Sequence, residues 1–350
     1  MLTAAKPRLT QATLDKLVAG AAAKKHIYGA TFQVASPDGA FTLTSASGNM
    51  ALNAPFYIAS INKMLLAALA LRLIREGQMR FTDRIAAYLP TDLLQGLHVH
   101  KGVEYTGEIT ILHLLSQTSG LPCYLIDKRP EGPKVMEELL RGADEAWPLE
   151  RVVAQVKCMK TKFRPGLSGK ASYGNTNFRL LGSILEVVTG RPLHELLTSL
   201  FEELQLEQTF VIQPDETRTL PPIYVKDTPV VLPRYFASSK YDVVSTTQDL
   251  MTFLKAFFSG HFYPKAQLQE LERWNSIFFP FKYGIGLQKF YTPWLLSPFN
   301  PIPDMIGHCG SVGTAAFYVP EKAIFITGSI NQTSSPSILF QTMIKILNQL

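Results

Sequence analysis

The segment Ser60-Ile61-Asn62-Lys63-Met64-Leu65-Leu66-Ala67-Ala68-Leu69-Ala70-Leu71 decides the fold. It is apolar nearly all round as far as Ile74, a pattern typical of a helix buried in the core of a large domain. Because Ser60 and Lys63 stand three positions apart, their side chains project from one face, about one turn apart. A helix start favours negative charge through its dipole and free N–H groups. The segment therefore favours a nucleophilic serine, with Lys63 as proton acceptor and the Ser60 N–H as an oxyanion donor.

The composition indicates an ordinary globular protein. At 350 residues the chain exceeds the usual size of a single hydrophobic core, so two lobes are expected. The chain is 46% hydrophobic and 18% charged, which excludes a disordered chain. Its net charge of +6 comes from scattered basic residues without a run of five, which favours a soluble surface over nucleic-acid binding. No stretch of 18 apolar residues occurs, so no membrane span is expected.

The cysteines and the N-terminus bear on the cellular compartment. Cys123, Cys158 and Cys309 are widely spaced and form no disulfide framework, which fits a reducing, cytoplasmic setting. The nearest candidate for a signal sequence lies inside residues 10–25, which we expect to form an amphipathic helix capped by Thr10. A chain whose signal peptide had been removed would look the same, so a periplasmic or secreted location stays open.

The order of elements predicts an α+β fold. The two ends favour strands, at residues 28–35, 41–45, 283–290, 315–319 and 323–328, with a turn at 36–39 joining the first two. Helices are expected at residues 109–115, 177–188, 192–201, 250–258 and 335–347, and the middle third reads as almost wholly helical, with 128–148 as a surface excursion. We therefore predict one antiparallel sheet built from both termini (residues 1–84 and 207–350), an inserted helical lobe (85–206), and a site in the cleft between them.

Three motifs in order strengthen the case for Ser60, because a Ser-x-x-Lys pair alone arises by chance roughly once in a chain of this length. The pair is followed by Tyr173-Gly174-Asn175 and by Gly307-His308-Cys309-Gly310. This series resembles the class C-type β-lactamase family, which includes DD-peptidases, D-aminopeptidases and related esterases. The resemblance covers roughly residues 28 to 330. It implies a cleft between an antiparallel sheet and a helical lobe.

The resemblance also implies the roles of the site residues. Ser60 would be the acylated nucleophile, Lys63 its partner, and Tyr173 the general base and then the acid for the leaving group. Asn175 would bond the amide or ester side of the substrate. His308 would stand on the sheet edge facing Tyr173, and the backbone N–H of Ser311 would be the second oxyanion donor.

The residue types at these positions lead to further expectations about protonation and substrate binding. A dry site would lower the pKa of Lys63, and the field of Lys63 and His308 would favour a tyrosinate at Tyr173. A glycine at position 310 would let the substrate backbone lie along the strand. Cys309 stands where typical class C β-lactamases carry a hydroxyl residue, which makes efficient β-lactam hydrolysis doubtful.

Simpler interpretations stand beside these. Lys63 could carry a buried stem to solvent, Tyr173 and His308 could be structural, and Asn175 could be a helix cap. His98-x-His100 lacks a third ligand nearby, so neither a metal nor a cofactor is expected. The aromatic runs at residues 278–281 and 291–296 favour packing over an acyl pocket.

The sequence therefore predicts a serine hydrolase that forms a Ser60 acyl-enzyme with small esters or with peptides and amides containing D-residues. The first alternative is a penicillin-binding protein or weak β-lactamase. The second is a non-catalytic scaffold of the same fold. The expected partner is a small-molecule ester, amide or peptide.

Overall fold

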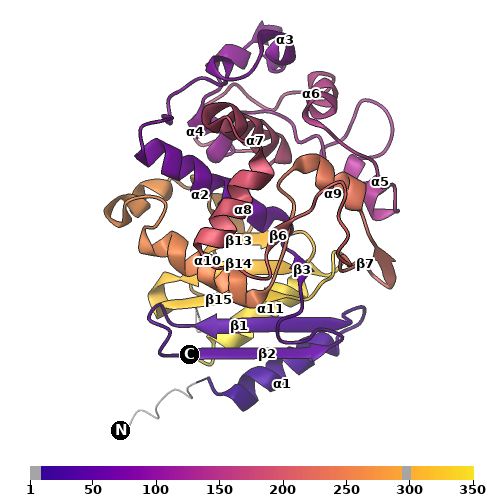
Figure 1. The fold of residues 1–350 in the computed structure, drawn as a ribbon, viewed down its shortest axis with the longest axis vertical. Helices are drawn as coiled ribbons and strands as arrows, with labels where there is room; N and C mark the ends of the chain where they lie inside the picture. The colour runs from indigo at the N-terminus through magenta and orange to yellow at the C-terminus, as the bar shows by residue number, and fades with distance from the viewer. Residues whose placement is uncertain (1–8, 294–300) are drawn as a thin grey trace.

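The structure, a computed structural model, describes residues 9–293 and 301–350, and its centre is one antiparallel sheet. The sheet has eight strands in the order β10-β11-β12-β13-β14-β15-β1-β2, so the two ends of the chain meet where β15 pairs with β1 (Figure 1). The strands are β1 (Gly29–Ala35), β2 (Thr42–Gly48), β10 (Asn275–Phe278), β11 (Phe281–Tyr283), β12 (Gln288–Phe290), β13 (Met305–Gly310), β14 (Thr314–Val319) and β15 (Ile324–Ser329). This confirms the predicted sheet built from both termini.

Helices cover both faces of this sheet. α1 (Gln11–Ala22), capped by Thr10 as predicted, packs beside α11 (Pro336–Leu347), and their apolar residues share one core cluster with β1, β14 and β15. On the other face lie α2 (Asn62–Arg75) and α10 (Thr247–Ser259), of which α10 contacts β15, β14 and β1. The residues of α2 from Asn62 to Leu71 are all buried. The expected buried helix is confirmed, and its own start carries the candidate site.

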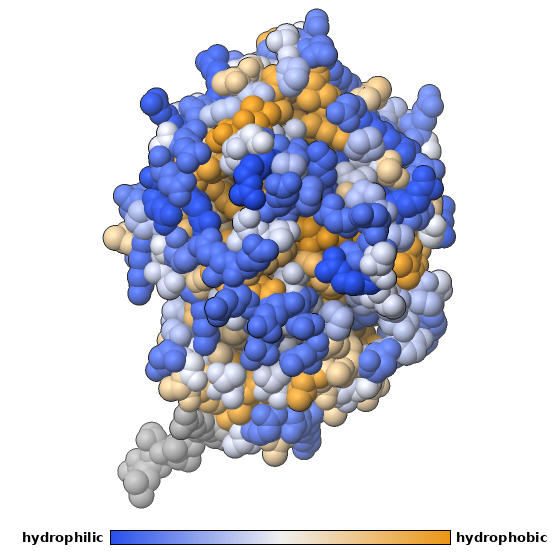
Figure 2. Space-filling model, in the orientation of Figure 1, coloured by the Kyte–Doolittle hydropathy of each residue, from blue (hydrophilic) through white to orange (hydrophobic). Residues whose placement is uncertain are grey.

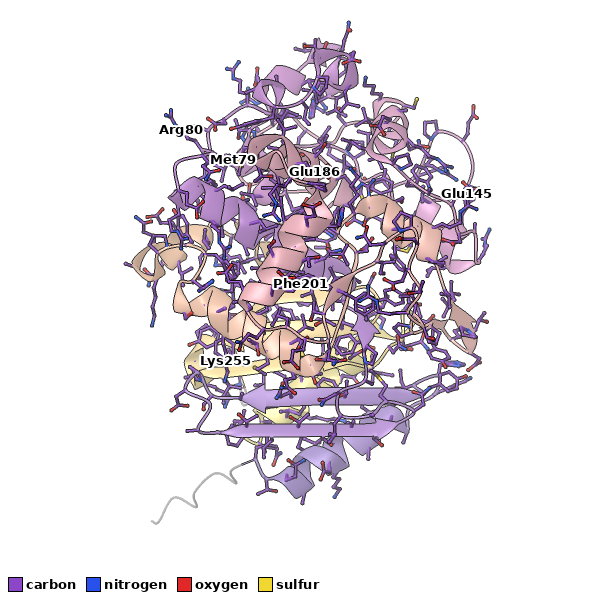
Figure 3. The ribbon with its side chains drawn as sticks, viewed as in Figure 1. Met79, Arg80, Glu145, Glu186, Phe201 and Lys255 are labelled. Atoms are coloured by element: carbon purple, nitrogen blue, oxygen red, sulfur yellow. The ribbon has the colours of Figure 1, made fainter. Side chains whose placement is uncertain are left out.

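The next helices along the chain are α3 (Thr91–Leu94), α4 (Ile111–Leu115), α5 (Val135–Leu140), α6 (Leu149–Lys157), α7 (Asn175–Thr189) and α8 (Leu193–Glu203). In Figure 1, α3, α4, α6 and α7 lie above α2, whereas α5 lies to its right and α8 runs from α7 down toward the sheet. Glu186 of α7, labelled in Figure 3, accepts a 3.0 Å hydrogen bond from the Leu193 N–H and so caps the start of α8. α7 packs on α2, which joins this region to the sheet through one continuous core. The lobe boundaries at residues 84/85 and 206/207 stay a prediction.

Several expected elements differ from the structure. Residues 283–290 are not one strand, because the chain turns through Gly284 and Gly286 and splits into β11 and β12. Gly286 has φ +69°, a left-handed conformation that costs glycine least. The middle third also holds a hairpin, β4 (Val99–His100) with β5 (Val103–Glu104). The helix α9 (Pro233–Ser239) was not anticipated, and β13 was expected only through the family resemblance, since neither has a long periodic pattern.

Three small strands and one hairpin complete the fold. β3 (Phe56–Tyr57) and β6 (Phe210–Val211) both pair with β9 (Val243–Ser245), and this small sheet leads the chain into the start of α2. The hairpin β7 (Ile223–Val225) and β8 (Thr228–Val230) stands at the side of the molecule near α5 and α9 in Figure 1. These elements become walls of the candidate site.

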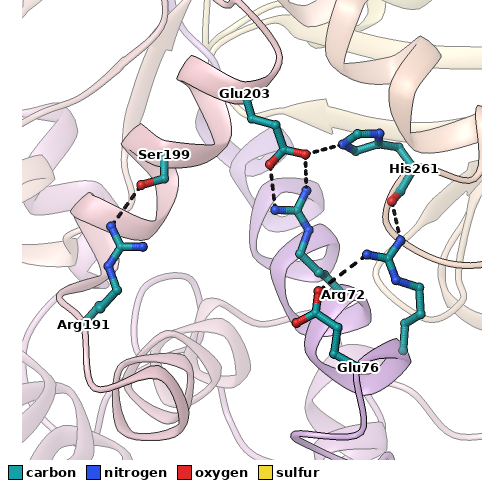
Figure 4. A network of polar contacts seen from close by, with 7 residues as sticks. Arg72, Glu76, Arg191, Ser199, Glu203 and His261 are labelled. Atoms are coloured by element: carbon teal, nitrogen blue, oxygen red, sulfur yellow. Dashed lines mark hydrogen bonds and ion pairs between the residues drawn. The ribbon is translucent and has the colours of Figure 1, made fainter.

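A polar network fastens α2 to its neighbours away from that site (Figure 4). Arg72 of α2 donates two hydrogen bonds, of 2.7 and 2.9 Å, to the Glu203 carboxylate of α8. His261, which follows α10, contacts the same carboxylate, and its carbonyl accepts a 2.7 Å bond from Arg75. The network therefore ties three segments together at the far end of α2.

The surface agrees with the scattered charge of the sequence. Hydrophilic residues dominate the face drawn in Figure 2, with smaller apolar areas between them. Within the described ranges, no helix has both the length and the apolar character that crossing a bilayer requires.

Candidate active site

Ser60 lies on a strained turn that the backbone holds from two sides. It is the middle residue of the 3₁₀ turn Ala59–Ile61 between β3 and α2, and Ala59 has φ +48°, which is unfavourable for a residue with a side chain. The Ile58 N–H donates to the Val243 carbonyl at 3.0 Å, and the Ile58 carbonyl accepts a 3.1 Å bond from Thr314 Oγ1. The strain is therefore held by β9 and β14, next to the candidate nucleophile.

Lys63 touches that nucleophile from a buried position. Its Nζ donates a 3.1 Å hydrogen bond to Ser60 Oγ, and only 2% of the residue is exposed. Burial lowers the pKa of Lys63 to about 8, while the nearby Cys123 and Asp242 oppose this shift. The expected lowering of the lysine pKa is thus present, and burial is its cause. A lysine reaching solvent is the wrong interpretation.

Tyr173 faces the same pair from the loop before α7. The Lys63 Nζ lies 5.2 Å from the centre of the Tyr173 ring. Gln117 fixes this loop, since its carbonyl accepts from the Ser172 N–H and its Oε1 from the Gly174 N–H, at 2.9 and 3.0 Å. Burial raises the pKa of Tyr173 well above its usual value, and a hydrogen bond with Ser60 only partly opposes this. The expected tyrosinate is therefore wrong for the free protein: the phenol is neutral.

His308 is neutral as well. Burial, together with the nearby charge of Lys63, lowers its pKa to about 3. Its Nδ1 lies 2.7 Å from the Cys309 carbonyl and must carry the hydrogen, so Nε2 accepts from the Tyr283 hydroxyl at 3.3 Å. The ring lies 6.0 Å from that of Tyr173, as predicted, yet it cannot supply the positive field that the sequence analysis assigned to it.

The position of His308 in the sheet also differs from the prediction. β13 lies between β12 and β14, but its pairing with β12 ends at Gly307, so only this last part of β13 is open on one side. The Gln288 side chain fills that opening, because its Oε1 accepts from both the N–H and the thiol of Cys309 at 3.1 Å. Cys309 therefore faces Gln288.

Gly310 is required for a different reason than the one expected. A Cβ at this position would lie 2.2 Å from Thr314 Oγ1 and 2.5 Å from the Ile58 carbonyl oxygen. The first of these atoms belongs to β14 and the second to the turn that carries Ser60, whereas the prediction placed the substrate backbone there. The glycine lets β13 approach the nucleophile turn closely.

An apolar cavity of about 320 Å³ opens beside Ser60. Ser60, Lys63, Asn175 and Ser311 all line it, so the structure brings these predicted residues to one wall. Asn175 is the first residue of α7 after the cap Gly174, and its side chain makes no capping bond. Most of the remaining wall is aliphatic and aromatic, including Leu125, Met136, Leu139, Leu232, Phe236 and Val312.

The two expectations about this neighbourhood have different outcomes. Residues 128–148 are more than a surface excursion, because α5 packs against the core and supplies Met136 and Leu139 to the cavity. The aromatic run at 278–281 does not line the cavity, in agreement with the favoured interpretation: Phe281 packs against Phe290, while Phe278 and Phe279 are exposed. Residues 294–296 of the second run lie outside the described residues.

The histidines of the helical region have ordinary partners. His98 Nε2 lies 2.9 Å from the Phe163 carbonyl, and His100 Nδ1 lies 3.1 Å from Thr161 Oγ1. Among residues 9–293 and 301–350, no group of three histidine, cysteine or acidic residues is arranged to hold a metal ion.

Three residues of the site carried no sequence signal. Gln117 adopts φ +61° and holds the Tyr173 loop, Tyr283 donates to His308, and Asp242 lines the cavity. Only Gln117 stands close to a motif, in the series after residue 109, and nothing in the spacing marks its role.

Comparison with known proteins identifies the family to which the chain belongs. A family model described as Beta-lactamase matches residues 14–342. The chain belongs to the Beta-lactamase family. It is 25% identical over 314 residues to the D-alanyl-D-alanine-carboxypeptidase/endopeptidase AmpH of Escherichia coli (strain K12), covering 84% of this chain and 74% of that protein.

Solved structures show the same Beta-lactamase fold. A D-stereospecific amidohydrolase from Streptomyces sp. matches with a TM-score of 0.74 and 24% identity, over 95% of this chain and 98% of its own. A D-amino acid amidase from Ochrobactrum anthropi SV3 matches with a TM-score of 0.76 and 20% identity, over 96% and 100% of the two chains. The predicted fold and family resemblance are confirmed.

Proposed function

We propose that this member of the Beta-lactamase family is a serine hydrolase that forms an acyl-enzyme at Ser60 with small esters or amides, including those of D-amino acids. One observation carries the proposal: a buried lysine with a pKa lowered to about 8 donates a 3.1 Å hydrogen bond to a serine on a strained turn at a cavity mouth. A serine hydroxyl needs such a base to become a nucleophile. The D-stereospecific amidohydrolase and D-amino acid amidase among its structural neighbours motivate the substrate class.

The protonation states assign the steps. In the fraction of molecules with a neutral amine, Lys63 accepts the Ser60 proton as Oγ attacks the carbonyl carbon. The N–H groups of Ser60 and Ser311 bind the oxyanion, as the resemblance implies. The neutral Tyr173 hydroxyl then donates its proton to the leaving group and regains one from the Lys63 ammonium. His308 holds Tyr283 and carries no charge in this scheme.

The cavity defines the acyl group that fits. Its aliphatic walls from α5, α9 and the β7–β8 side favour an apolar acyl chain. Ser60, Lys63 and Asn175 are among its polar lining residues, and the scissile bond would lie at Ser60.

A labelling experiment tests the proposal. The protein is incubated with a fluorophosphonate, and the mass adduct is mapped by peptide sequencing. We expect one adduct, on Ser60, and none on Ser60→Ala. Hydrolysis of p-nitrophenyl butyrate by Ser60→Ala at the wild-type rate would refute the proposal. Cys158→Ser is a matched control, because this exposed thiol lies outside the cavity and its loss should change nothing.

Penicillin-binding or weak β-lactamase activity is a second candidate, because the chain is 22% identical to a Beta-lactamase of Pseudomonas fluorescens over 78% of each protein. Gln288 occupies the N–H and thiol of Cys309, so these donors are not free for a β-lactam carboxylate. We therefore expect slow acylation by penicillins with little turnover of nitrocefin. Fast nitrocefin turnover would reverse the ranking. Absence of labelling would instead favour a scaffold role.

The proposal also includes a small-molecule partner and a cytoplasmic setting. Cys123, Cys158 and Cys309 are free thiols, which suits a reducing compartment. Fractionation of the native host, followed by immunodetection of the protein, tests this placement.

A further inference from the structure

An acidic residue lies in the apolar cavity beside the nucleophile. Asp242 immediately precedes β9, and Asn62 is two positions after Ser60 in the first turn of α2. Asn62 Nδ2 donates a 2.9 Å hydrogen bond to Asp242 Oδ1, and both residues line the cavity with Ser60. The mechanism above uses neither of them.

Asn62 leaves an acceptor without a partner. Only 3% of the residue is exposed, and its Oδ1 has no hydrogen-bond partner in the part of the chain that the structure describes. Because Nδ2 is committed to Asp242, the free atom is the amide oxygen, an acceptor only. Leaving a buried polar atom unpaired is costly, so this atom indicates a missing donor.

The basic side chains near Asp242 donate their hydrogen bonds to other residues. Lys63 and Arg179 are the basic groups whose charges act on it. Lys63 donates to Ser60, and Arg179 donates to the carbonyls of Trp147 and Ser238. No ion pair to Asp242 occurs among the described residues. Burial raises the pKa of Asp242 to about 6, so the carboxylate is charged at neutral pH.

We propose that Asp242 and Asn62 bind a protonated amine carried by the acyl group of the substrate. A carboxylate oxygen and an amide oxygen on one wall are complementary to an ammonium group, which offers only donors. The aliphatic wall formed by residues such as Leu125 and Leu139 would take an apolar side chain of the same acyl group. The substrate class is thus an ester or amide of an apolar amino acid with a free amino group. This inference rests on the proposed function, since it places the ammonium next to an acyl group on Ser60.

The same arrangement disfavours neutral acyl groups. An acyl chain without an amine would displace water from the cavity and leave the Asp242 carboxylate without a new donor. A site built to hydrogen-bond a polar group rejects an analogue that lacks it far more strongly than an apolar pocket rejects a missing methylene. Asp242 is therefore a specificity residue.

A binding experiment separates this inference from catalysis. Calorimetry compares 3-phenylpropylamine with 3-phenylpropan-1-ol, which matches it in shape but is neutral. The proteins are wild type, Asp242→Asn, Asp242→Ser and the control Asp144→Asn. Asp144 is a suitable control because it accepts bonds from the N–H groups of Arg234 and Tyr235 in α9 and does not line the cavity. Melting curves show that each variant is folded.

We expect wild type and Asp144→Asn to bind the amine about tenfold or more tighter than the alcohol, and both Asp242 variants to bind the two within about twofold. The inference would be overturned if wild type bound the amine and the alcohol equally well. It would also be overturned if the Asp242 variants kept the wild-type preference for the amine, or if Asp144→Asn lost it. Fluorophosphonate labelling reports on the proposed function separately. If Ser60 is labelled but wild type binds the amine and the alcohol equally, only the ammonium site is refuted. If wild type prefers the amine but Ser60 is not labelled, only the acyl-enzyme is refuted.

Discussion

The protonation of Lys63 should govern the rate at which Ser60 reacts. With a pKa of about 8, the neutral amine makes up about 10% of the lysine at pH 7 and about 90% at pH 9. Because only the neutral amine accepts the Ser60 proton, the rate rises as pH passes upward through the pKa. We therefore expect about a tenfold rise between pH 7 and pH 9, followed by a plateau. Single-turnover labelling by a fluorophosphonate measures this step without product release.

Two variants test the assignment. Lys63→Arg keeps its charge at every accessible pH, so it should remove the rise and lower the rate by about 10² or more. Asp242→Asn removes a negative charge that raises the pKa of Lys63, so its midpoint should fall below that of wild type. Asp144→Asn should leave the midpoint in place. A rate independent of pH between 6 and 10, or a midpoint near the ordinary lysine value of 10.5, would show that Lys63 is not the base.

Three further outcomes are expected. Gly310→Ala places a Cβ against Thr314, so labelling of Ser60 should slow about 10²-fold and the free energy of unfolding should fall by about 2 kcal/mol. An unchanged labelling rate would show that this glycine does not have the role assigned to it. Glu203→Gln weakens the pairing with Arg72, which is partly exposed, so chemical denaturation should show a loss of about 1 kcal/mol or less and full activity. Asp242→Asn should raise the melting temperature at pH 7.5. The pKa of the Asp242 carboxyl is higher in the folded state than in the unfolded state, so the carboxyl contributes stability at low pH, and this contribution is lost as pH rises through about 6. The difference should shrink as pH falls toward the unfolded pKa of 3.8, below which both states are protonated.

The order of elements could be read from the sequence because their signals are local. The apolar run after Ser60, the cap at Thr10 and the glycine after Val188 each mark an element through neighbouring residues. The pattern of residues did not predict β13, which was expected only through the resemblance, because its six residues include two glycines and a histidine and its strand character comes from pairing with β14. Such a strand becomes visible only when its partner is in place.

The motif positions were predictable, but their charges were not. Helical spacing predicted that Ser60 and Lys63 meet, and the family resemblance added Tyr173; both contacts are present. The protonation of Tyr173 and His308 depends on burial by residues far away in the sequence and on partners such as Tyr283. The tyrosinate expected at Tyr173 required a positive field from His308, and so an imidazolium. Burial reverses that expectation and leaves Lys63 as the proton acceptor of the candidate mechanism.

The turn that carries the candidate nucleophile is held mainly by residues outside the three motifs. Ala59 keeps a left-handed conformation because its neighbour Ile58 is bonded on one side to β9 and on the other to Thr314. Gly310 lets β13 close against that turn, so the third motif acts on Ser60 through packing as well as through any contact with substrate. A variant can therefore retain Ser60, Lys63 and Tyr173 and still lose activity, if it releases this turn. We therefore expect activity to depend on the register between β13, β14 and the start of α2 as well as on the three motifs.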